Sequence, residues 1–225
     1  MTDRIIVALD VENIDQAKSL VNKIGDEINF YKIGLELMAS GKYFELIKWL
    51  KEQGKKVFCD LKLYDISKTI ERTVQNLAKH NIDLLTIHAA SLDIMQKAAQ
   101  NKGNMEIIGV TVLTNLDQND LGEMGFDQNL SLENLVIKKA ELSLKAGLNG
   151  VVASANEAKI LREKLGGDFK IITPGIRLEK VENDDQKRVC TAKEAIENGA
   201  SYLVVGRPIT KSDNPKLAAQ KFNDV

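Results

Sequence analysis

Eight apolar runs rich in β-branched residues recur along the chain, and a segment of helical periodicity follows each of them. Regular alternation of strands and helices builds a parallel sheet whose crossovers are helices. Eight such units without an intervening linker predict an α/β fold of the (β/α)8 TIM-barrel type. A doubly wound open sheet is the alternative that this pattern leaves open. The predicted strands are Ile5–Leu9, Phe30–Gly34, the first part of Val57–Ile66, Leu84–Ile87, Ile107–Leu113, Gly150–Ala153, Lys170–Thr173 and Tyr202–Arg207.

The size and charge of the chain indicate one domain without a broad affinity for polyanions. Its 225 residues, 44% of them hydrophobic, are enough for one substantial core, and we expect a single barrel domain over residues 1–225. A formal net charge of −1 provides no general attraction for nucleic acid or for an anionic membrane surface. No apolar run reaches the roughly 18 residues that span a bilayer, and the first residues lead directly into a strand. We therefore expect a cytoplasmic protein with neither nucleic acid nor a membrane as partner.

Cysteine and histidine are scarce, which excludes several kinds of site. The two cysteines, Cys59 and Cys190, do not form a disulfide framework, and we expect reduced thiols. The two histidines, His80 and His88, exclude a histidine-rich metal site and weaken a Ser-His-Asp interpretation.

Three charged residues, Asp60, Lys62 and Asp65, accompany the end of the third predicted strand. Alternate side chains of a strand share a face, so Asp60 and Lys62 are expected to point the same way, with Asp65 in the turn that follows. A surface ion pair that closes a strand would explain an isolated Asp-x-Lys. Polar residues follow most of the other predicted strands as well, however, and in a barrel these carboxyl ends meet at one mouth. The residues expected to converge are Asp10, Lys32, Asp60, Lys62, Asp65, His88, Thr114, Ser154 and Arg177.

Two loops that pair glycine with arginine follow the seventh and eighth strands. They are Gly175-Ile176-Arg177 and Gly206-Arg207-Pro208. Barrel enzymes often bind phosphate at these two loops, where glycine lets an oxyanion approach the backbone N–H groups. Ordinary turn chemistry is the other explanation. We predict a phosphorylated small-molecule substrate, and the polar segment Leu178–Val189 is expected to be either a solvated loop or a lid over that site.

These motifs, taken in order along the whole chain, resemble those of the orotidine 5′-phosphate decarboxylase family. The Asp-x-Lys-x-x-Asp part alone is less specific, because sugar-phosphate enzymes of related barrels share it. The matching segments are Ala8-Leu9-Asp10, Tyr31-Lys32-Ile33-Gly34, Asp60 to Ile66 with Thr69, Thr173-Pro174-Gly175-Ile176-Arg177, Asp185-Gln186 with Arg188, and Val204 to Thr210.

The resemblance implies an enzyme that converts orotidine monophosphate to uridine monophosphate in de novo pyrimidine biosynthesis, without a metal or an organic cofactor. It implies a charged array of Lys32, Asp60, Lys62 and Asp65, with Lys62 as the proton donor to the carbon that loses carbon dioxide. It also implies a homodimer with shared active sites, in which Asp65, Ile66 and Thr69 reach the partner subunit's site. The implied substrate contacts are Asp10 and Lys32 to the ribose, Ser154 to the pyrimidine, Thr114 and Pro174 as further contacts, and Arg177, Gln186, Gly206 and Arg207 to the phosphate.

The sequence departs from the usual family pattern at three positions. Asp184 stands where many members have glycine, Asn115 where serine is frequent, and Ala192 where proline is common. Two other functions stay open. A metal-dependent sugar-phosphate decarboxylase or aldolase would share the barrel, although Lys32 lies where a metal-binding acid is expected. A catalytically silent barrel is the second alternative, but buried charges are costly to keep without a role.

Overall fold

The computed structural model describes residues 4–178 and 190–225. Within them, eight parallel strands close into a barrel in the order β1-β10-β7-β6-β5-β4-β3-β2. Val7 of β1 pairs with Tyr31 on one side and with Val205 on the other, so the sheet has no free edge. The predicted TIM barrel is therefore confirmed, and the open-sheet alternative is wrong. The barrel strands are β1 (Ile5–Ala8), β2 (Phe30–Gly34), β3 (Lys56–Leu63), β4 (Leu84–His88), β5 (Glu106–Val110), β6 (Gly150–Val152), β7 (Lys170–Thr173) and β10 (Tyr202–Val205).

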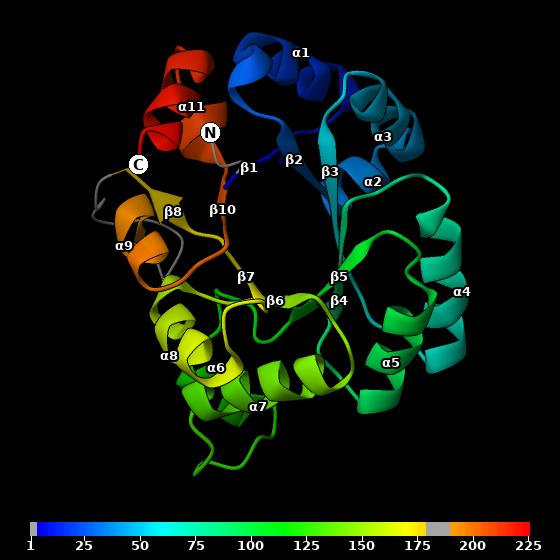
Figure 1. Ribbon diagram of the computed structural model, residues 1–225, viewed down its shortest axis with the longest axis vertical. Coiled ribbons are helices and arrows are strands. Elements are labelled where there is room, and N and C mark those ends of the chain that lie inside the picture. The colour runs from blue at the N-terminus through cyan, green and yellow to red at the C-terminus, as the bar shows by residue number, and fades with distance from the viewer. Residues whose placement is uncertain (1–3, 179–189) are drawn as a thin grey trace.

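Helices surround the strands in a ring, and the last helix packs against the first one (Figure 1). None of the helices in the described part of the chain is long and apolar enough to cross a bilayer. The helices are α1 (Ile14–Ile24), α2 (Leu35–Ala39), α3 (Tyr43–Glu52), α4 (Ser67–Ala78), α5 (Leu92–Asn101), α6 (Gln118–Glu123), α7 (Leu132–Lys145), α8 (Ala155–Leu165), α9 (Ala192–Glu197), α10 (Arg207–Thr210) and α11 (Pro215–Asn223), with a 3-10 turn at Gly25–Glu27.

Helix α1 illustrates how the sequence sets these elements. The Asn13 side chain caps its first turn by accepting a hydrogen bond from the N–H of Gln16 at 3.0 Å. Its buried residues Ile14, Ala17, Val21 and Ile24 recur every three or four positions and face the barrel. Gly25 ends the helix in the left-handed region, at φ 66°.

Strand alternation divides the core into two layers. Inside the barrel, one apolar cluster comprises Ile6, Ala8, Phe30, Phe58, Leu84, Ile108, Ile172 and Val204. The residues of opposite parity, such as Val7, Tyr31 and Cys59, pack outward against the helices in a larger cluster. Lys32 stands two residues after Phe30, and Asp60 stands two residues after Phe58. Both side chains therefore point into the barrel and lie above this inner apolar cluster.

Several boundaries differ from the sequence prediction. Strand β5 ends at Val110 rather than Leu113, because Val152 at the end of the short β6 is the last residue to pair with it. The last barrel strand ends at Val205, and Arg207 already belongs to α10. Ile176–Arg177 (β8) leaves the barrel and pairs with Cys190–Thr191 (β9) in a separate two-stranded sheet. Helix α6 lies in the connection between β5 and α7, where the side chains of Asp117 and Asp120 form a capping box.

Candidate active site

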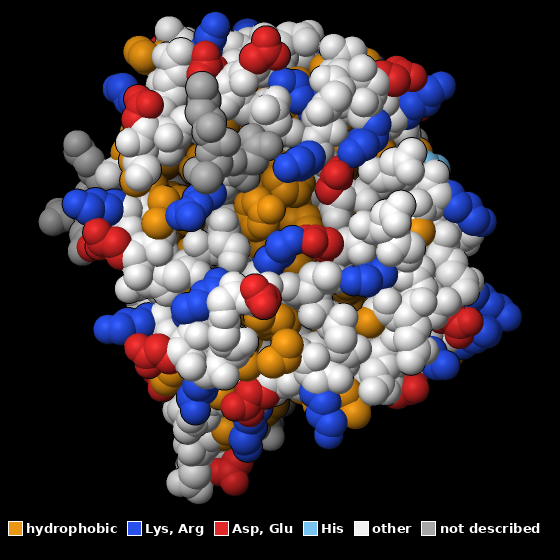
Figure 2. All heavy atoms as spheres, in the orientation of Figure 1, with side chains coloured by type: hydrophobic (Ala, Val, Ile, Leu, Met, Phe, Trp, Pro, Cys, Tyr) orange, Lys and Arg blue, Asp and Glu red, His pale blue; other side chains and the backbone are white. Residues whose placement is uncertain are grey.

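A cavity of about 470 Å³ opens at the carboxyl ends of the barrel strands. Apolar side chains form its floor, among them Ala8, Phe58 and Val204, and polar groups from several strands line its wall. Figure 2 shows apolar side chains near the centre of this face, with lysine or arginine and aspartate or glutamate side chains beside them. The volume lies in the range of ordinary small-molecule sites. The polar lining residues are Asp10, Lys32, Asp60, Lys62, Thr114, Arg177, Arg207, Thr210 and Lys211.

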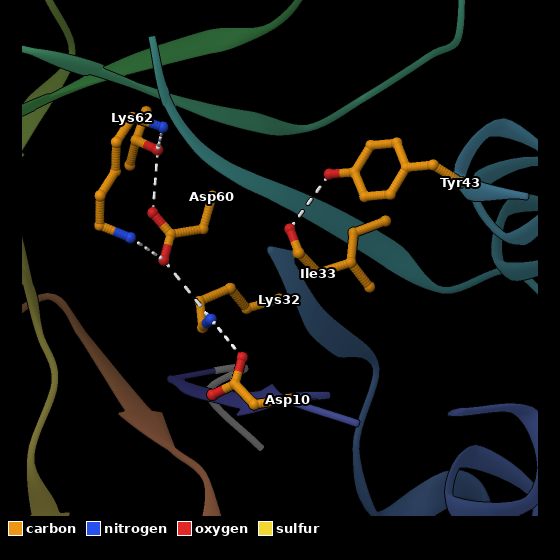
Figure 3. A network of polar contacts seen from close by, with 7 residues as sticks. Asp10, Lys32, Ile33, Tyr43, Asp60 and Lys62 are labelled. Carbon is orange, nitrogen blue, oxygen red and sulfur yellow. Dashed lines mark hydrogen bonds and ion pairs between the residues drawn. The ribbon is translucent and has the colours of Figure 1, made fainter. Parts of the chain in front are cut away.

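Four of the predicted site residues form a line of alternating charge across this cavity (Figure 3). The Lys32 Nζ lies 2.9 Å from Asp10 Oδ1 and 3.4 Å from Asp60 Oδ2. The Lys62 Nζ donates a hydrogen bond to the same Asp60 Oδ2 at 2.8 Å. Lys32 comes from β2, Asp60 and Lys62 come from β3, and Asp10 follows the end of β1, so the fold rather than local sequence brings these three segments together.

Burial and charge oppose one another within this array. Only 11% of the Lys32 side chain and 12% of the Asp60 side chain are exposed. Burial disfavours the ammonium of Lys32, but the charges of Asp60 and Asp10 outweigh it and hold the pKa of Lys32 above its ordinary value. Burial likewise disfavours the Asp60 carboxylate, but Lys32 and Lys62 hold the pKa of Asp60 below its ordinary value. Both groups are therefore charged at neutral pH.

The backbone around Lys62 is irregular. Lys62 has φ 47°, in the left-handed region that few residues other than glycine adopt, and the pairing of β3 with β4 shifts register between Cys59 and Leu63. Its N–H donates to the Thr86 Oγ1 at 2.9 Å, and the Thr86 hydroxyl donates to Asp60 Oδ1 at 2.9 Å. The sequence prediction missed Thr86. Strand alternation could have indicated it: Thr86 stands two residues before His88, so both side chains point to the same face of β4, toward the barrel interior.

Asp65, Ile66 and Thr69 do not join the array of their own chain. All three are exposed, and 71% of the Ile66 surface is accessible. The Asp65 carboxylate accepts a hydrogen bond from the neighbouring Ile66 N–H at 2.7 Å. These residues lie where β3 passes into α4, on the outside of the mouth.

The glycine–arginine loops border the same cavity at the ends of β7 and β10, and β10 is the neighbour of β1. Pro174, Gly175 and Arg177 line it from the end of β7, and Gly206 and Arg207 from the end of β10. Gly175 has φ 77°, a conformation that suits glycine. Helix α10 begins directly after Gly206 with Pro208 in its first turn, a position that the fixed φ of proline suits. Gln186, together with Asp184, Asp185 and Arg188, lies outside the described residues.

The remaining predicted residues occupy different environments. Thr114 is half-buried and lines the cavity. Ser154 is buried at the start of α8, and among the described residues its Oγ has no hydrogen-bond partner. His88 is half-buried with its ring against that of Tyr64, and burial followed by the charges of Lys139 and Lys62 lowers its pKa. In residues 4–178 and 190–225 no cluster of three His, Cys, Asp or Glu side chains is arranged to hold a metal ion.

A closed (β/α)8 barrel with paired charges and glycine–arginine loops at one mouth is typical of barrel enzymes that act on phosphorylated small molecules. Sequence and structure comparisons narrow this class. A profile of the Orotidine 5'-phosphate decarboxylase / HUMPS family matches residues 3–222. The chain therefore belongs to that family.

Individual relatives agree with the family match over nearly the whole chain. The chain is 45% identical over 222 residues to the orotidine 5'-phosphate decarboxylase of Methylococcus capsulatus, covering 98% of this chain and 90% of that protein. It is 47% identical over 220 residues to the enzyme of the same name from Nitrobacter winogradskyi, covering 97% and 90% of the two chains. The crystal structure of orotidine 5'-phosphate decarboxylase from Lactobacillus acidophilus superposes with a TM-score of 0.87 at 34% identity, covering 98% and 97%.

Proposed function

We propose that this chain decarboxylates orotidine 5′-monophosphate to uridine 5′-monophosphate in de novo pyrimidine biosynthesis, with residues 1–225 acting as one catalytic domain. The observation that carries the proposal is the line of alternating charges from Asp10 to Lys62 at the barrel mouth. It occurs in a chain whose family match covers residues 3–222. The proposed reaction uses side chains alone, without a metal or an organic cofactor.

Lys62 is the proposed proton donor. Loss of carbon dioxide leaves carbanion character at the pyrimidine carbon, and a fixed ammonium stabilises that charge more in the transition state than in the ground state. The Lys62 Nζ is held by Asp60 at 2.8 Å at the edge of the cavity, which supports this role. After the carbon–carbon bond breaks, the electron pair on the carbon takes a proton from the ammonium, and carbon dioxide leaves.

Asp60 is proposed to lie beside the substrate carboxylate and to favour its departure by repulsion. Two unit charges about 4 Å apart, at an effective dielectric constant near 20, interact by roughly 4 kcal/mol. That corresponds to about a thousandfold in rate, so repulsion is only one part of the catalysis. Lys32 supports the role because it keeps the Asp60 carboxylate ionised.

The phosphate is proposed to bind between the two glycine–arginine loops, with Arg177, Gly206 and Arg207 joined by Gln186. Pro174 borders this position and fixes the loop after β7. The two arginines provide charge-assisted hydrogen bonds, and the glycines allow the backbone to approach the phosphate oxygens. Phosphate contacts far from the reacting carbon raise the rate only if they help to assemble the site. The predicted lid, Leu178–Val189, lies almost entirely outside the described residues.

The nucleoside is proposed to lie between these two groups of residues. Asp10 and Lys32 are ribose-hydroxyl contacts, Ser154 hydrogen-bonds the pyrimidine, and Thr114 is a further substrate contact. The buried Ser154 Oγ supports its role, since a buried hydroxyl is stabilised by gaining a hydrogen-bond partner. Asp10 remains more than half exposed while bonding Lys32, so one of its oxygens stays accessible to a ligand.

The active unit is proposed to be a homodimer with shared sites, in which Asp65, Ile66 and Thr69 complete the partner's cavity. The exposure of these residues beside their own cavity supports the proposal. Apolar side chains are also exposed nearby, Tyr64 and Ile66 at 71% each and Leu35 at 57%. Such a surface at the rim of a site is typical of an interface between subunits.

Mixing two inactive variants tests the shared site. In a mixed dimer of Lys62→Ala with Asp65→Ala, one site carries both defects and the other carries neither. Activity should therefore reappear on mixing and subunit exchange. If each chain builds its own site, the mixture stays as inactive as its components. Two preparations of the same variant, mixed in the same way, are the control.

The cytoplasm is the proposed place of action. Cys59 and Cys190 are both free thiols, which suits a reducing compartment. Cell fractionation with an antibody to the chain tests this, and recovery in the membrane or secreted fraction would contradict it.

The function itself is tested by the loss of ultraviolet absorbance of orotidine monophosphate with purified protein in EDTA. Conversion to uridine monophosphate establishes the reaction and its independence of added metal. No conversion in EDTA or with magnesium, with preserved binding of uridine monophosphate, would favour the catalytically silent barrel. Magnesium-dependent turnover of a sugar phosphate would favour the alternative enzyme of the same superfamily.

A further inference from the structure

We propose that Thr86 is a positioning residue of this site, whose single hydroxyl fixes both the Asp60 carboxylate and the backbone turn that presents Lys62. The inference rests on the proposed function, because it concerns how the array is held for decarboxylation. Thr86 belongs to β4, whereas Asp60 and Lys62 belong to β3. The hydroxyl thus connects the catalytic strand to its neighbour.

The direction of both hydrogen bonds is determined by chemistry. The Lys62 backbone N–H can only donate, so the Thr86 oxygen accepts at 2.9 Å. A hydroxyl has one hydrogen, and the Asp60 carboxylate is an acceptor, so that hydrogen points at Oδ1, also at 2.9 Å. Thr86 is fully buried, so water does not replace either bond when the hydroxyl is removed.

The first bond compensates an unfavourable backbone conformation. Lys62 lies at φ 47°, within the register shift between β3 and β4. In that conformation the N–H of Lys62 bonds a side chain of β4, whereas N–H groups in a regular ladder bond carbonyl oxygens. Without the Thr86 hydroxyl this N–H would lose its hydrogen-bond partner, and the local turn would lose a contact that holds it.

Because of the second bond, the two carboxylate oxygens of Asp60 have different partners. Oδ1 accepts from Thr86, and Oδ2 receives both Lys62 at 2.8 Å and Lys32 at 3.4 Å. A hydrogen bond at one oxygen restrains rotation of the carboxylate, so the other oxygen stays directed at the two ammonium groups. Loss of the hydroxyl frees this rotation and removes one of the groups that lower the pKa of Asp60.

The test compares Thr86→Val, which keeps the shape and removes the hydroxyl, with Thr86→Ser, which keeps the hydroxyl. We expect kcat of Thr86→Val to fall roughly 10- to 100-fold, the effect of losing one hydrogen bond to a charged group. The dissociation constant of uridine monophosphate should change less than about threefold, because Thr86 touches none of the proposed phosphate or ribose contacts. Thr86→Ser should recover most of kcat. Equal loss in both variants, or wild-type kcat in Thr86→Val, would overturn the proposal.

Thr111→Val is the matched control. Thr111 is also a buried threonine, and its hydroxyl donates to the Val152 carbonyl at 2.9 Å without contacting the array. It should lower the melting temperature about as much as Thr86→Val and leave kcat unchanged. If Thr86→Val does not fold, Thr86→Cys replaces it, since a thiol of similar size is a weak donor.

A second readout separates this proposal from the proposed function. The carboxyl carbon resonance of Asp60, followed by NMR titration, reports its pKa without turnover. Among the described residues, Lys32 and Lys62 face Asp60 and His88 of β4 also interacts with its charge, and all three remain in Thr86→Val. The pKa of Asp60 should rise in Thr86→Val and not in Thr86→Ser or Thr111→Val. An unchanged pKa would overturn the positioning role even if the wild-type protein proved inactive on orotidine monophosphate.

Discussion

Both ends of the barrel carry lysine–carboxylate pairs, but the two ends use them differently. At the base, the end of the barrel where the strands begin, the Lys51 ammonium lies 2.7 Å from the Asp83 carboxylate, and the Lys170 ammonium donates to both carboxylate oxygens of Glu106. Each of these ammonium groups has its own carboxylate, and their side chains are about 30% exposed. At the mouth, by contrast, one Asp60 oxygen serves both Lys32 and Lys62 in a nearly buried position.

The backbone differs between the two ends as well. At the base, Gly150 of β6 pairs in regular register with Ile108 of β5 and Lys170 of β7, and a Cβ on Gly150 would lie 2.2 Å from the Lys170 carbonyl oxygen. At the mouth, the register shifts and Lys62 takes a left-handed conformation. Separate, partly exposed ion pairs like those at the base contribute to structure, whereas a shared, buried carboxylate beside an irregular backbone is typical of a functional site. Substitutions at the two ends should therefore separate activity from stability.

The largest expected effect is that of Lys62→Ala. Without the ammonium, nothing stabilises and protonates the carbanion-like carbon, so kcat should fall by more than about a thousandfold while uridine monophosphate still binds. Steady-state kinetics and calorimetric titration measure the two quantities. Lys170→Ala at the base is the matched control and should keep kcat within a few-fold. Retained decarboxylation in Lys62→Ala would remove this lysine from its proposed role.

Arg207→Ala should have the next largest effect, on kcat/KM. Arg207 is exposed at the start of α10, so folding depends little on it, whereas one charge-assisted contact to a phosphate contributes about 1.5–3 kcal/mol or more. We expect kcat/KM to fall at least about 10- to 100-fold with a melting temperature close to that of the wild type. Lys216→Ala on α11, a surface lysine 3.8 Å from Glu27, is the control and should change neither. Unchanged kcat/KM in Arg207→Ala would exclude this loop as the phosphate site.

Lys32→Met tests the electrostatics of the mouth through pH. In the folded wild type the pKa of Asp60 is depressed, so its contribution to stability is present above the unfolded-state pKa and is lost as pH falls through the folded-state pKa. Removing Lys32 leaves burial opposed by Lys62 and the Thr86 hydroxyl, and the pKa of Asp60 rises. The acid limb of the pH profile of kcat/KM should therefore move to higher pH.

The comparison with the base makes this prediction specific. Lys51→Met breaks the pair with Asp83 at the other end of the barrel and should leave the acid limb where it is in the wild type. If the acid limb moves equally in Lys32→Met and Lys51→Met, the shift reflects a general loss of stability rather than the pKa of Asp60. No shift in Lys32→Met would show that Asp60 is not the group that titrates on the acid limb.

The sequence predicted the mouth better than the base. Asp60 and Lys62 were expected on one face because strand parity is local, and the convergence of Lys32 and Asp10 follows from barrel closure. The ion pair between Lys170 and Glu106 at the base joins residues 64 positions apart in the sequence, and neither residue belongs to a local motif that predicts the pair. The left-handed turn at Lys62 was also unpredictable, because a lysine rarely adopts it and the stabilising Thr86 belongs to another strand.

Glu106→Gln should have the smallest effect and bears on the base alone. Its ion pair with Lys170 is about one-third exposed, and pairs of this kind contribute about 0.2–1 kcal/mol after solvent screening. We expect urea unfolding to show a loss of that size with the same m-value, and kcat/KM to stay at the wild-type level. Asp60→Asn is the contrasting variant, since it removes the carboxylate shared by the buried Lys32 and the half-buried Lys62 and should lower both stability and kcat/KM. A fall in kcat/KM of more than about threefold in Glu106→Gln would mean that this ion pair affects the active site through β5. Activity and stability would then not be separated between the two ends of the barrel.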